Sequence, residues 1–364
     1  MQQNHLVERF YRYIACDSES GNERNFCLLM EAELQALGFH TWRDEIGAKI
    51  GSNGWNIGAR LDGEGDPILF CCHLDTVSPG VGIHPRVEDG VIYSDGTTIL
   101  ASDDKSGIAE VLEAVDLVLR GGRAHRPVEI LLTLSEELGL RGSKNVDFSP
   151  FTARQAIVLD SSIFGRIINK APAHIAMHVE IHGKSAHAGV CPENGVHALK
   201  AAARAIDRIP CGQVDADTRM NVGNCIAKGK TNVVPDEAAF DLEIRCFDAD
   251  LLEQHIQQVK DTIQQACDAY RASYECSMER HCGVLSVPHD SQLIQTMVEE
   301  FRQGGKELTI GITFGGSDAS SLAQYGIQVV NTGTGMSNVH GTGEHIAICD
   351  MEYMCTFLQR MICL

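Results

Sequence analysis

The apolar residues in the first half of the chain form two kinds of pattern. In Leu6–Cys16 and Asn25–Leu37 they recur every three or four positions, which predicts two amphipathic helices. In Ile68–Cys72 and Val128–Leu134 they form short unbroken runs, which predict strands buried on both faces. Because strand-like and helical segments alternate in this part of the chain, the pattern indicates an α/β domain with a largely parallel sheet.

After Pro172 the order of the segments changes. Six segments follow one another as strand, helix, strand, strand, helix and strand: His174–Ile181, Gly195–Ile209, Met220–Ala227, Ala238–Phe247, Leu251–Ala272 and Ser273–His281. The order βαββαβ is that of a ferredoxin-like unit. From about Val287 the α/β pattern resumes. We therefore expect a discontinuous α/β domain of residues 1–172 and 284–364, into which residues 173–283 are inserted as a separate α+β domain.

The length of the chain bears on the number of its domains, and its charge bears on the partners that it can bind. A chain of 364 residues suits two domains better than one. Lys and Arg number 30 against 49 Asp and Glu, so the formal net charge is −19, which argues against a nucleic-acid partner and against binding to an anionic membrane surface. No apolar run approaches the ~18 residues of a membrane-spanning helix, so we expect no membrane partner.

The cysteines and the first residues of the chain indicate its compartment. The 14 cysteines include no Cys-x-x-Cys pair and are scattered through predicted strands and helices, for example Cys71, Cys225 and Cys355. The N-terminal residues lack the basic segment and the apolar run of a secretory signal. We therefore expect mostly buried thiols in a reducing, cytoplasmic environment.

Polar residues with possible chemistry follow two of the predicted strands. The run Val128–Leu134 leads into the adjacent carboxylates Glu136 and Glu137, and such groups are costly to bury without partners. Taken alone, this pair is equally consistent with a solvated loop. His73 and Asp75 follow the other strand and lie on one side of it, because side chains alternate along a strand. That arrangement suits an aspartate that orients a metal-binding imidazole, although a surface ion pair would look the same.

Three further candidates lie elsewhere in the chain. Asp103 and Asp104 precede a helix predicted at Ile108–Arg120, where carboxylates are also ordinary N-terminal caps. Asp160 ends another predicted strand, and His340 lies in a glycine-rich loop. As a set, five oxygen and nitrogen donors would suit two divalent cations with one shared carboxylate. The remaining carboxylate could then act as a general base.

The segments that carry these residues resemble the co-catalytic zinc peptidase family that contains peptidase T, carboxypeptidase G and aminoacylase. Five segments carry the resemblance, in chain order: His73-Leu74-Asp75-Thr76-Val77, Ala101-Ser102-Asp103-Asp104-Lys105-Ser106-Gly107, Ser135-Glu136-Glu137, Leu159-Asp160 and Val339-His340-Gly341. They are similar to the first ligand motif, the Asp-x-Lys-x-Gly motif, the Glu-Glu motif and the last two ligand positions. The Asp-Asp-Lys triplet and Leu138-Gly139-Leu140-Arg141-Gly142-Ser143 are most similar to peptidase T and its shorter relatives.

The resemblance implies a role for each of these residues. The implied metal ligands form two groups that share one carboxylate: His73, Asp103 and Asp160, and Asp103, Glu137 and His340. Asp75 would orient His73. Glu136 would be the general base, which accepts a proton from an activated water molecule and passes it to the leaving amine. The implied cofactors are two divalent metal ions, zinc by default for mixed imidazole and carboxylate ligands, although cobalt or manganese could substitute.

The resemblance extends to the predicted insert, which corresponds to a lid that forms the dimer contact in this family. The segment His182–Gly189 is similar to the lid segment that supplies a substrate-binding histidine, here His187. In the family's dimers that residue reaches the active site of the neighbouring subunit, where it would help to stabilise the oxyanion. Asn232 and Arg245 lie in segments similar to the substrate-contact segments of the lid. A homodimer through the insert is therefore expected.

The function that the resemblance implies is metal-dependent hydrolysis of short peptides by a tripeptidase-like aminopeptidase. A second possibility is hydrolysis of N-acyl amino acids or of another amide, by a deacylase or a carboxypeptidase with the same metals. A third, from a different class, is a non-catalytic homologue that binds metal or serves as a scaffold. The fold that the resemblance implies is an α/β zinc-peptidase domain with a mostly parallel sheet and an inserted ferredoxin-like α+β lid.

Overall fold

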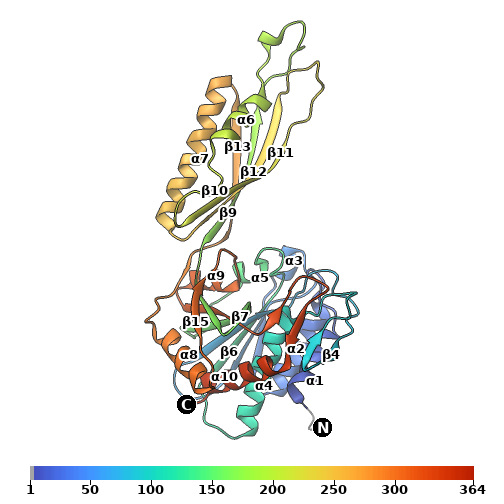
Figure 1. Cartoon of the computed structure of the whole chain (residues 1–364), viewed down its shortest axis with the longest axis vertical. Coiled ribbons are helices and arrows are strands. Elements are labelled where there is room, and N and C mark those ends of the chain that lie inside the picture. The colour runs from blue at the N-terminus through green and yellow to red at the C-terminus, as the bar shows by residue number, and fades with distance from the viewer. Residues whose placement is uncertain (1–3) are drawn as a thin grey trace. The chain divides into compact units, whose positions relative to one another are not determined.

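The computed structural model describes residues 4–364, whose helices and strands are drawn in Figure 1. This part of the chain forms two compact units. The first contains the chain up to Lys170 together with Leu285–Thr313 and Ser317–Leu364, and the second contains Ala171–Val284 and Phe314–Gly316. The first unit is thus discontinuous in the sequence.

A nine-stranded sheet forms the centre of the first unit. Its strands are β1 His40–Arg43, β2 Ile57–Leu61, β3 Ile68–His73, β6 Val128–Thr133, β7 Gln155–Phe164, β8 Arg166–Ala171, β14 Leu285–Ser286, β15 Thr309–Ile312 and β16 Gln328–Gly333. They lie in the order β1-β2-β6-β3-β7-β16-β8-β14, and β15 pairs with β8. The central pairs β6–β3, β3–β7 and β7–β16 are parallel, whereas β1–β2, β2–β6 and β16–β8 are antiparallel.

The two central strands β3 and β6 are buried along their whole length. This burial fits the unbroken apolar runs of the sequence, because a strand in the middle of a covered parallel sheet has no solvent-facing side. The expected α/β fold class with an inserted α+β lid is confirmed. The sheet differs in one respect, since its parallel centre is flanked by antiparallel strands.

Eight α-helices and one 3₁₀ turn accompany the sheets within the described part of the first unit. They are α1 His5–Ile14, α2 Arg24–Ala36, α3 Gly47–Ile50, α4 Ser102–Arg120, α5 Arg141–Lys144, α8 Gln292–Gln303, α9 Asp318–Leu322, η2 Ala323–Tyr325 and α10 Ile348–Ile362. The two helices expected near the N-terminus are present as α1 and α2. Helix α4 packs against β3 and β7, and α1 and α10 pack against α4. The central helix therefore lies directly against the strands whose ends carry candidate ligands.

The first unit also contains a small antiparallel sheet of four strands. Its strands are β4 Arg86–Glu88, β5 Val91–Tyr93, β17 Met336–Ser337 and β18 His345–Ala347, in the order β17-β18-β5-β4. The turn between β4 and β5 contains Asp89 and Gly90, both of which have positive φ. The glycine-rich segment before His340 was expected to be a loop, but it contains the short strand β17. A strand of only two residues leaves no recognisable pattern in the sequence.

The second unit is an antiparallel sheet covered by two helices. Its elements are β9 Ala173–His182, η1 Pro192–Asn194, α6 Ala198–Arg208, β10 Gly212–Gln213, β11 Thr218–Ile226, β12 Glu237–Cys246, α7 Ala249–Tyr270 and β13 Ser273–Cys282. The strands lie in the order β10-β11-β12-β9-β13. Alternate residues of β9 are buried in one core with residues of α6 and α7. Apart from the short β10, this is the ferredoxin-like order βαββαβ.

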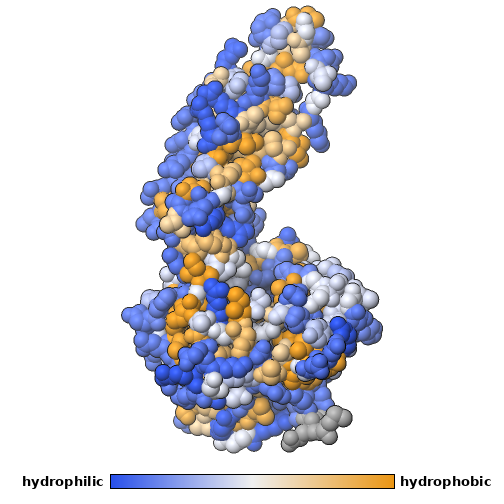
Figure 2. Space-filling model, viewed as in Figure 1, coloured by the Kyte–Doolittle hydropathy of each residue, from blue (hydrophilic) through white to orange (hydrophobic). Residues whose placement is uncertain are grey.

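The surface of the molecule and the burial of its cysteines can be compared with what the sequence predicted. The view in Figure 2 shows hydrophilic residues interspersed with scattered hydrophobic ones. None of the helices within residues 4–364 combines the length and the apolar character that a bilayer span requires. All 14 cysteines are free, but only seven of them are buried. Cys211, Cys225 and Cys349 are exposed, so the expectation of mostly buried thiols is wrong.

Candidate metal centre

Three neighbouring parallel strands bring four candidate residues to one edge of the large sheet. His73 is the last residue of β3, and Glu136 and Glu137 follow β6. Asp160 lies inside β7, which continues to Phe164, so the prediction that Asp160 ends its strand is wrong. Strand β3 pairs in parallel with both β6 and β7, so these ends lie side by side. Ligand sites of open α/β sheets are found at this edge.

Two groups of three possible metal ligands meet there and share one carboxylate. The groups are His73, Asp103 and Asp160, and Asp103, Glu137 and His340; in each, one ligand atom per residue lies within 4.8 Å of the others. A third group of the same kind consists of His73, Glu136 and Glu137. The structure therefore brings together all six residues that the sequence suggested for the ligands and the base.

Asp103 lies between two imidazoles. Its Oδ1 is 2.9 Å from Nε2 of His73, and its Oδ2 is 3.2 Å from Nε2 of His340. The same Nε2 of His340 is 2.8 Å from Oε1 of Glu137. Each oxygen of Asp103 thus faces the donor nitrogen of a different group, which is the arrangement that a carboxylate shared by two cations requires.

Asp75 connects His73 with the turn that carries the two glutamates. Nδ1 of His73 lies 2.9 Å from the backbone carbonyl oxygen of Asp75 and 3.4 Å from its Oδ1. The buried carboxylate of Asp75 accepts the backbone N–H groups of Glu136 (2.9 Å) and Glu137 (3.3 Å) and the hydroxyl of Ser20 (2.6 Å). Donation from Nδ1 leaves Nε2 free to act as a ligand atom. Asp75 therefore holds both the imidazole and the glutamates.

The turn after β6 aims the glutamates away from the strand. The apolar run Val128–Leu134 predicted a strand that ends at Leu134, and β6 ends one residue earlier, at Thr133. Ser135 has a left-handed φ of 48°, which directs the chain out of the sheet, and its hydroxyl donates to the buried carboxylate of Glu23 (2.9 Å). Glu23 comes from a segment more than 100 residues earlier, so the local sequence could not show this support.

The pKa values of the shared carboxylate Asp103 and of the exposed imidazole His340 are shifted in opposite directions. Burial alone would raise the pKa of Asp103, but its hydrogen bonds with His340 and His73 outweigh burial and hold the pKa well below its usual range. The hydrogen bonds of His340 with Asp103 and Glu137 raise the pKa of this histidine to about 10. Both shifts favour positive charge next to Asp103.

The pKa values of two neighbouring acids, Glu136 and Asp160, are raised, whereas that of Asp103 is lowered. Burial, followed by the charge of Asp160, raises the pKa of Glu136 well above its usual value. Burial and the charge of Asp103 do the same for the pKa of Asp160. These carboxyl groups crowd together in a region of low polarity and lack enough cationic partners. Carboxylate oxygens and imidazole nitrogens in two overlapping groups fit two divalent cations, which would supply that positive charge.

Three buried acids beside the site were given no role as ligand or base from the sequence. Asp104, for which a helix cap was one interpretation, accepts the backbone N–H of His73 at 3.2 Å. Asp318 accepts the hydroxyl of Thr133, at the end of β6. Glu344 accepts hydrogen bonds from the segment that leads into Asp103. All of these contacts join distant parts of the chain, so the local pattern carries no signal for them.

The three residues expected to contact substrate from the insert lie in the second unit. His187 is exposed, and the neighbouring Ala188 donates its N–H to the carbonyl of Asn232 (2.9 Å), so these two segments are adjacent. Arg245 binds both carboxylate oxygens of Glu243 (3.2 Å each) and the carbonyl of Phe314 (2.7 Å). The ligand groups of the first unit form without these residues, and their substrate roles stay predictions.

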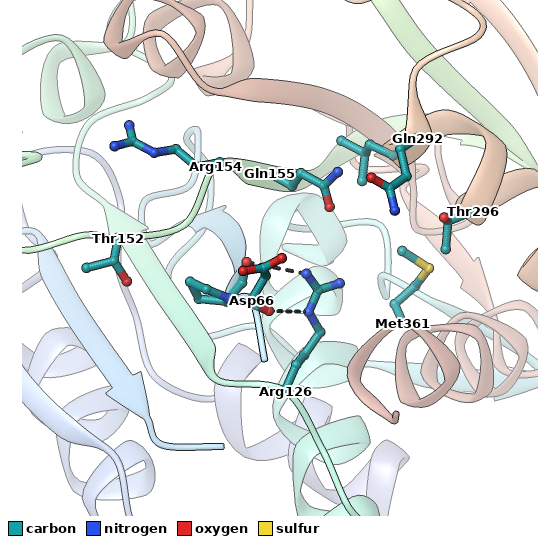
Figure 3. A pocket seen from close by; sticks show the side chains of 10 residues that line it. Asp66, Arg126, Thr152, Arg154, Gln155, Gln292, Thr296 and Met361 are labelled. Carbon is teal, nitrogen blue, oxygen red and sulfur yellow. Dashed lines mark hydrogen bonds between the residues drawn. The ribbon is translucent and has the colours of Figure 1, made fainter. Parts of the chain in front are cut away.

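A separate cavity of about 410 Å³ lies near the amino ends of strands of the large sheet (Figure 3). Asp66 and Gln155 line it just before β3 and at the start of β7, and Gln292 and Met361 line it from α8 and α10. Arg126 points between these side chains and donates to the carbonyl oxygen of Asp66 at 2.7 Å. None of the candidate ligands lines this cavity, so it is separate from the candidate metal site at the other edge of the sheet.

Two protein-family models match adjoining parts of the chain. One is described as peptidase family M28 and matches residues 56–171, the segment that carries His73, Asp103, Glu136, Glu137 and Asp160. The other is described as a peptidase dimerisation domain and matches residues 171–274. The second match covers most of the second unit.

Whole-chain comparisons reveal relatives that contain both parts. The protein YqjE of Bacillus subtilis is 32% identical over 351 residues, which cover 96% of this chain and 95% of YqjE. The crystal structure of aminopeptidase PepT from Bacillus cereus is 31% identical, with a TM-score of 0.93, and the match covers 98% of this chain and 97% of PepT. A tripeptidase structure from Staphylococcus aureus is 29% identical, with a TM-score of 0.92 and the same coverage.

Proposed function

The chain belongs to the M20 metallopeptidase family, among its peptidase T-like members, and on this basis we propose that it hydrolyses short peptides as a tripeptidase-like aminopeptidase. The observation that carries the proposal is the pair of three-ligand groups that share Asp103, with Glu136 beside them. The substrate class comes from the relatives, since two solved structures that are similar to the chain over nearly its whole length are those of an aminopeptidase and a tripeptidase.

The residues that would hold the cations are those of the two groups. His73, Asp103 and Asp160 would bind one, and Asp103, Glu137 and His340 the other. Zinc is the expected metal for this mixture of imidazole and carboxylate, and cobalt or manganese could replace it. When bound, two such cations polarise a scissile carbonyl and make a water molecule easier to deprotonate.

Glu136 is the proposed general base. It lies in the third group with His73 and Glu137, yet neither of the two groups around Asp103 needs it as a ligand. Burial and the charge of Asp160 raise its pKa, and a higher pKa makes a carboxylate a better proton acceptor. Glu136 would take the proton from the attacking water and deliver it to the leaving amine. Asp75, which holds the backbone of Glu136 and Glu137, would keep the base in place.

The dimer and the substrate contacts are part of the same proposal. The match to a peptidase dimerisation domain spans His187, Asn232 and Arg245. We place a homodimer contact in this unit and assign to His187 a hydrogen bond to the oxyanion in the partner's site. Asn232 and Arg245 would contact the substrate. The free state of all 14 cysteines suits a reducing compartment, which supports a cytoplasmic location.

A panel of substrates tests the proposal. The purified protein would be assayed on tripeptides, dipeptides and N-acyl amino acids, first as isolated, then after chelation, and finally after zinc, cobalt or manganese is added back. We expect tripeptides with a free amino terminus to be cleaved fastest, activity to disappear with chelator, and metal to restore it. Preferential cleavage of N-acyl amino acids would overturn the substrate assignment, and the absence of both bound metal and hydrolysis would overturn the enzyme.

A further inference from the structure

A buried carboxylate outside the two ligand groups holds the loop that leads to Asp103. The Glu344 side chain is fully buried and accepts four hydrogen bonds. Its Oε2 accepts the backbone N–H groups of Leu100 (2.8 Å) and Ala101 (3.0 Å). Its Oε1 accepts the hydroxyl of Ser102 (2.5 Å) and the backbone N–H of Asp103 (3.1 Å). One side chain therefore anchors four consecutive residues that precede it by more than 240 positions.

This loop needs an acceptor from outside. Ala101, at the N-cap of α4, has a left-handed φ of 60°, and its side chain caps no N–H group. Asp103 has a non-helical ψ of 104° within the first turn of the helix. The first N–H groups of a helix have no acceptor within it, and residues 100–103 are buried from water. Because an ionised carboxylate is a strong acceptor and an unmet buried N–H is costly, Glu344 fixes the path of the loop.

The same residue is also tied to the loop of the other imidazole. Glu344 follows His340 by four positions, and its backbone N–H donates to the carbonyl of Gly341 at 3.0 Å. His340 in turn contacts Oδ2 of Asp103 at 3.2 Å. Glu344 thus connects the two segments whose separation sets the geometry of the second ligand group.

We propose that Glu344 is a positioning residue of the metal centre, which sets the place of Asp103 against His340 and thereby the affinity for the cations. This inference rests on the proposed function. Exchange of Glu344 for Gln keeps the size of the side chain but turns an NH₂ donor toward N–H donors of the loop. The loop then loses at least one acceptor and shifts, and Asp103 shifts with it. Loss of such supporting contacts typically weakens metal binding about 10- to 100-fold.

Glu129, in β6 of the large sheet, provides a control. It is also fully buried, and its carboxylate accepts the N–H groups of Thr152 (3.0 Å) and Ala153 (3.0 Å), the hydroxyl of Thr152 (2.7 Å) and Nη1 of Arg60 (2.8 Å). It lies near the start of β6, whereas the candidate ligands follow the end of that strand. Glu129→Gln therefore removes a similar set of hydrogen bonds from the fold without touching the loop of Asp103.

The test measures zinc affinity directly, by competition with a chromophoric chelator, on the full-length wild type, Glu344→Gln and Glu129→Gln. We expect about 10- to 100-fold weaker binding for Glu344→Gln and wild-type affinity for Glu129→Gln. In the tripeptide assay, Glu344→Gln should lower kcat more than it changes KM, and excess zinc should restore part of the loss. Wild-type zinc affinity in a folded Glu344→Gln protein overturns the role of Glu344 and leaves the proposed function intact.

Two further outcomes decide the remaining cases. If Glu344→Gln does not fold, the decision rests on Ser102→Ala, which removes one of the four donors and should weaken zinc binding about fivefold, the equivalent of one hydrogen bond. Unchanged affinity in Ser102→Ala then overturns the inference. If the wild type itself binds no zinc, cobalt or manganese, this inference fails together with the proposed function.

Discussion

Glu136 and Glu137 are adjacent in the sequence but have different surroundings. Oε1 of Glu137 lies 2.8 Å from Nε2 of His340, within one of the ligand groups around Asp103. Glu136 is held through its backbone by Asp75, while burial and the charge of Asp160 keep its pKa high. These different contacts are what support the proposed roles, Glu137 as a ligand and Glu136 as the base.

Single substitutions separate the two roles. Glu137→Ala removes a ligand and should lower the bound metal from two ions toward one, as measured by elemental analysis after dialysis. Glu136→Ala should keep both ions and lose turnover by about 10²- to 10⁴-fold, the usual contribution of a general base. Glu136→Gln is the control for size and should behave like Glu136→Ala. If Glu136→Ala retains most of its activity, the assignment of the base is wrong.

Another buried acid, Glu110 of α4, makes a prediction about stability. Its side chain is fully buried, and neither carboxylate oxygen has a hydrogen-bond partner among the described residues. Burial raises the pKa of Glu110 well above its usual value, so the folded protein keeps this proton at pH values where the unfolded chain has released it. Folding stability should therefore fall as the pH rises above the unfolded pKa of about 4.3.

The variant Glu110→Gln isolates this effect because its amide does not titrate. In denaturant titrations of the metal-stripped proteins at pH 5.5 and 7.5, the stability of the wild type should fall relative to that of the variant. One such group contributes at most about 1.4 kcal/mol per pH unit. Stability curves that stay parallel between the two pH values would show that Glu110 is not held protonated.

At the scale of elements, the contact of α4 with β7 depends on Gly107. A Cβ at this position would lie 2.4 Å from Oδ1 of Asp104 and 2.9 Å from the carbonyl oxygen of Leu159. Because backbone cannot move aside as a flexible side chain can, Gly107 permits the close approach of the helix to the strand that carries Asp160. This gives a physical reason for the glycine of the Asp-x-Lys-x-Gly segment.

Gly107→Ala should force α4 away from β7. We expect a loss of about 1–3 kcal/mol in the free energy of unfolding, together with weaker metal binding, because Asp103 lies at the start of the same helix. Thermal unfolding and the chelator competition would measure the two effects. Gly229→Ala is the control, since its nearest contact is a side-chain atom of Pro235 at 3.7 Å, and it should change stability by less than about 0.5 kcal/mol.

The element boundaries show where the sequence was informative. The unbroken apolar runs predicted β3 and β6 because both faces of these strands are covered. The start of α4 was expected at Ile108 but lies at Ser102, because the carboxylate of Glu344 supplies the acceptors that its first turn lacks. The apolar run placed the end of β6 within one residue, at Leu134, but it gave no sign that the turn at Ser135 is supported by the distant Glu23.

At the scale of the whole molecule, the candidate ligands were accessible from the sequence because each lies in a short local motif. The supporting acids Glu23, Asp318 and Glu344 were not, since each acts through contacts with residues more than 100 positions away. The ferredoxin-like order of the second unit followed from simple alternation, as in β9. The pattern of burial could therefore be predicted from the sequence, whereas the long-range hydrogen bonds could not.

The proposed dimer gives a test that needs both units. If His187 acts in the partner's site, the inactive variants His187→Ala and Glu136→Ala should complement each other when co-expressed. The His187→Ala subunit then keeps its base and receives His187 from its partner, so tripeptidase activity should reappear in the mixed dimer. Co-expression of Glu136→Ala with Glu137→Ala is the control, because every site then carries a defect of its own. No recovery in the first pair would place His187 in its own subunit or outside the site.

The position of His340 near the end of the chain has a consequence for biosynthesis. During translation His73, Asp103 and Asp160 are synthesised before His340. The second ligand group is therefore incomplete until His340 has been added, and the large sheet is incomplete until β16 can pair with β7. Glu344, which anchors the loop of Asp103, emerges later still. A prematurely terminated chain therefore lacks the residues that complete the two-cation site. If the proposed site is correct, a chain that stops before His340 should bind one cation instead of two and should not hydrolyse peptides.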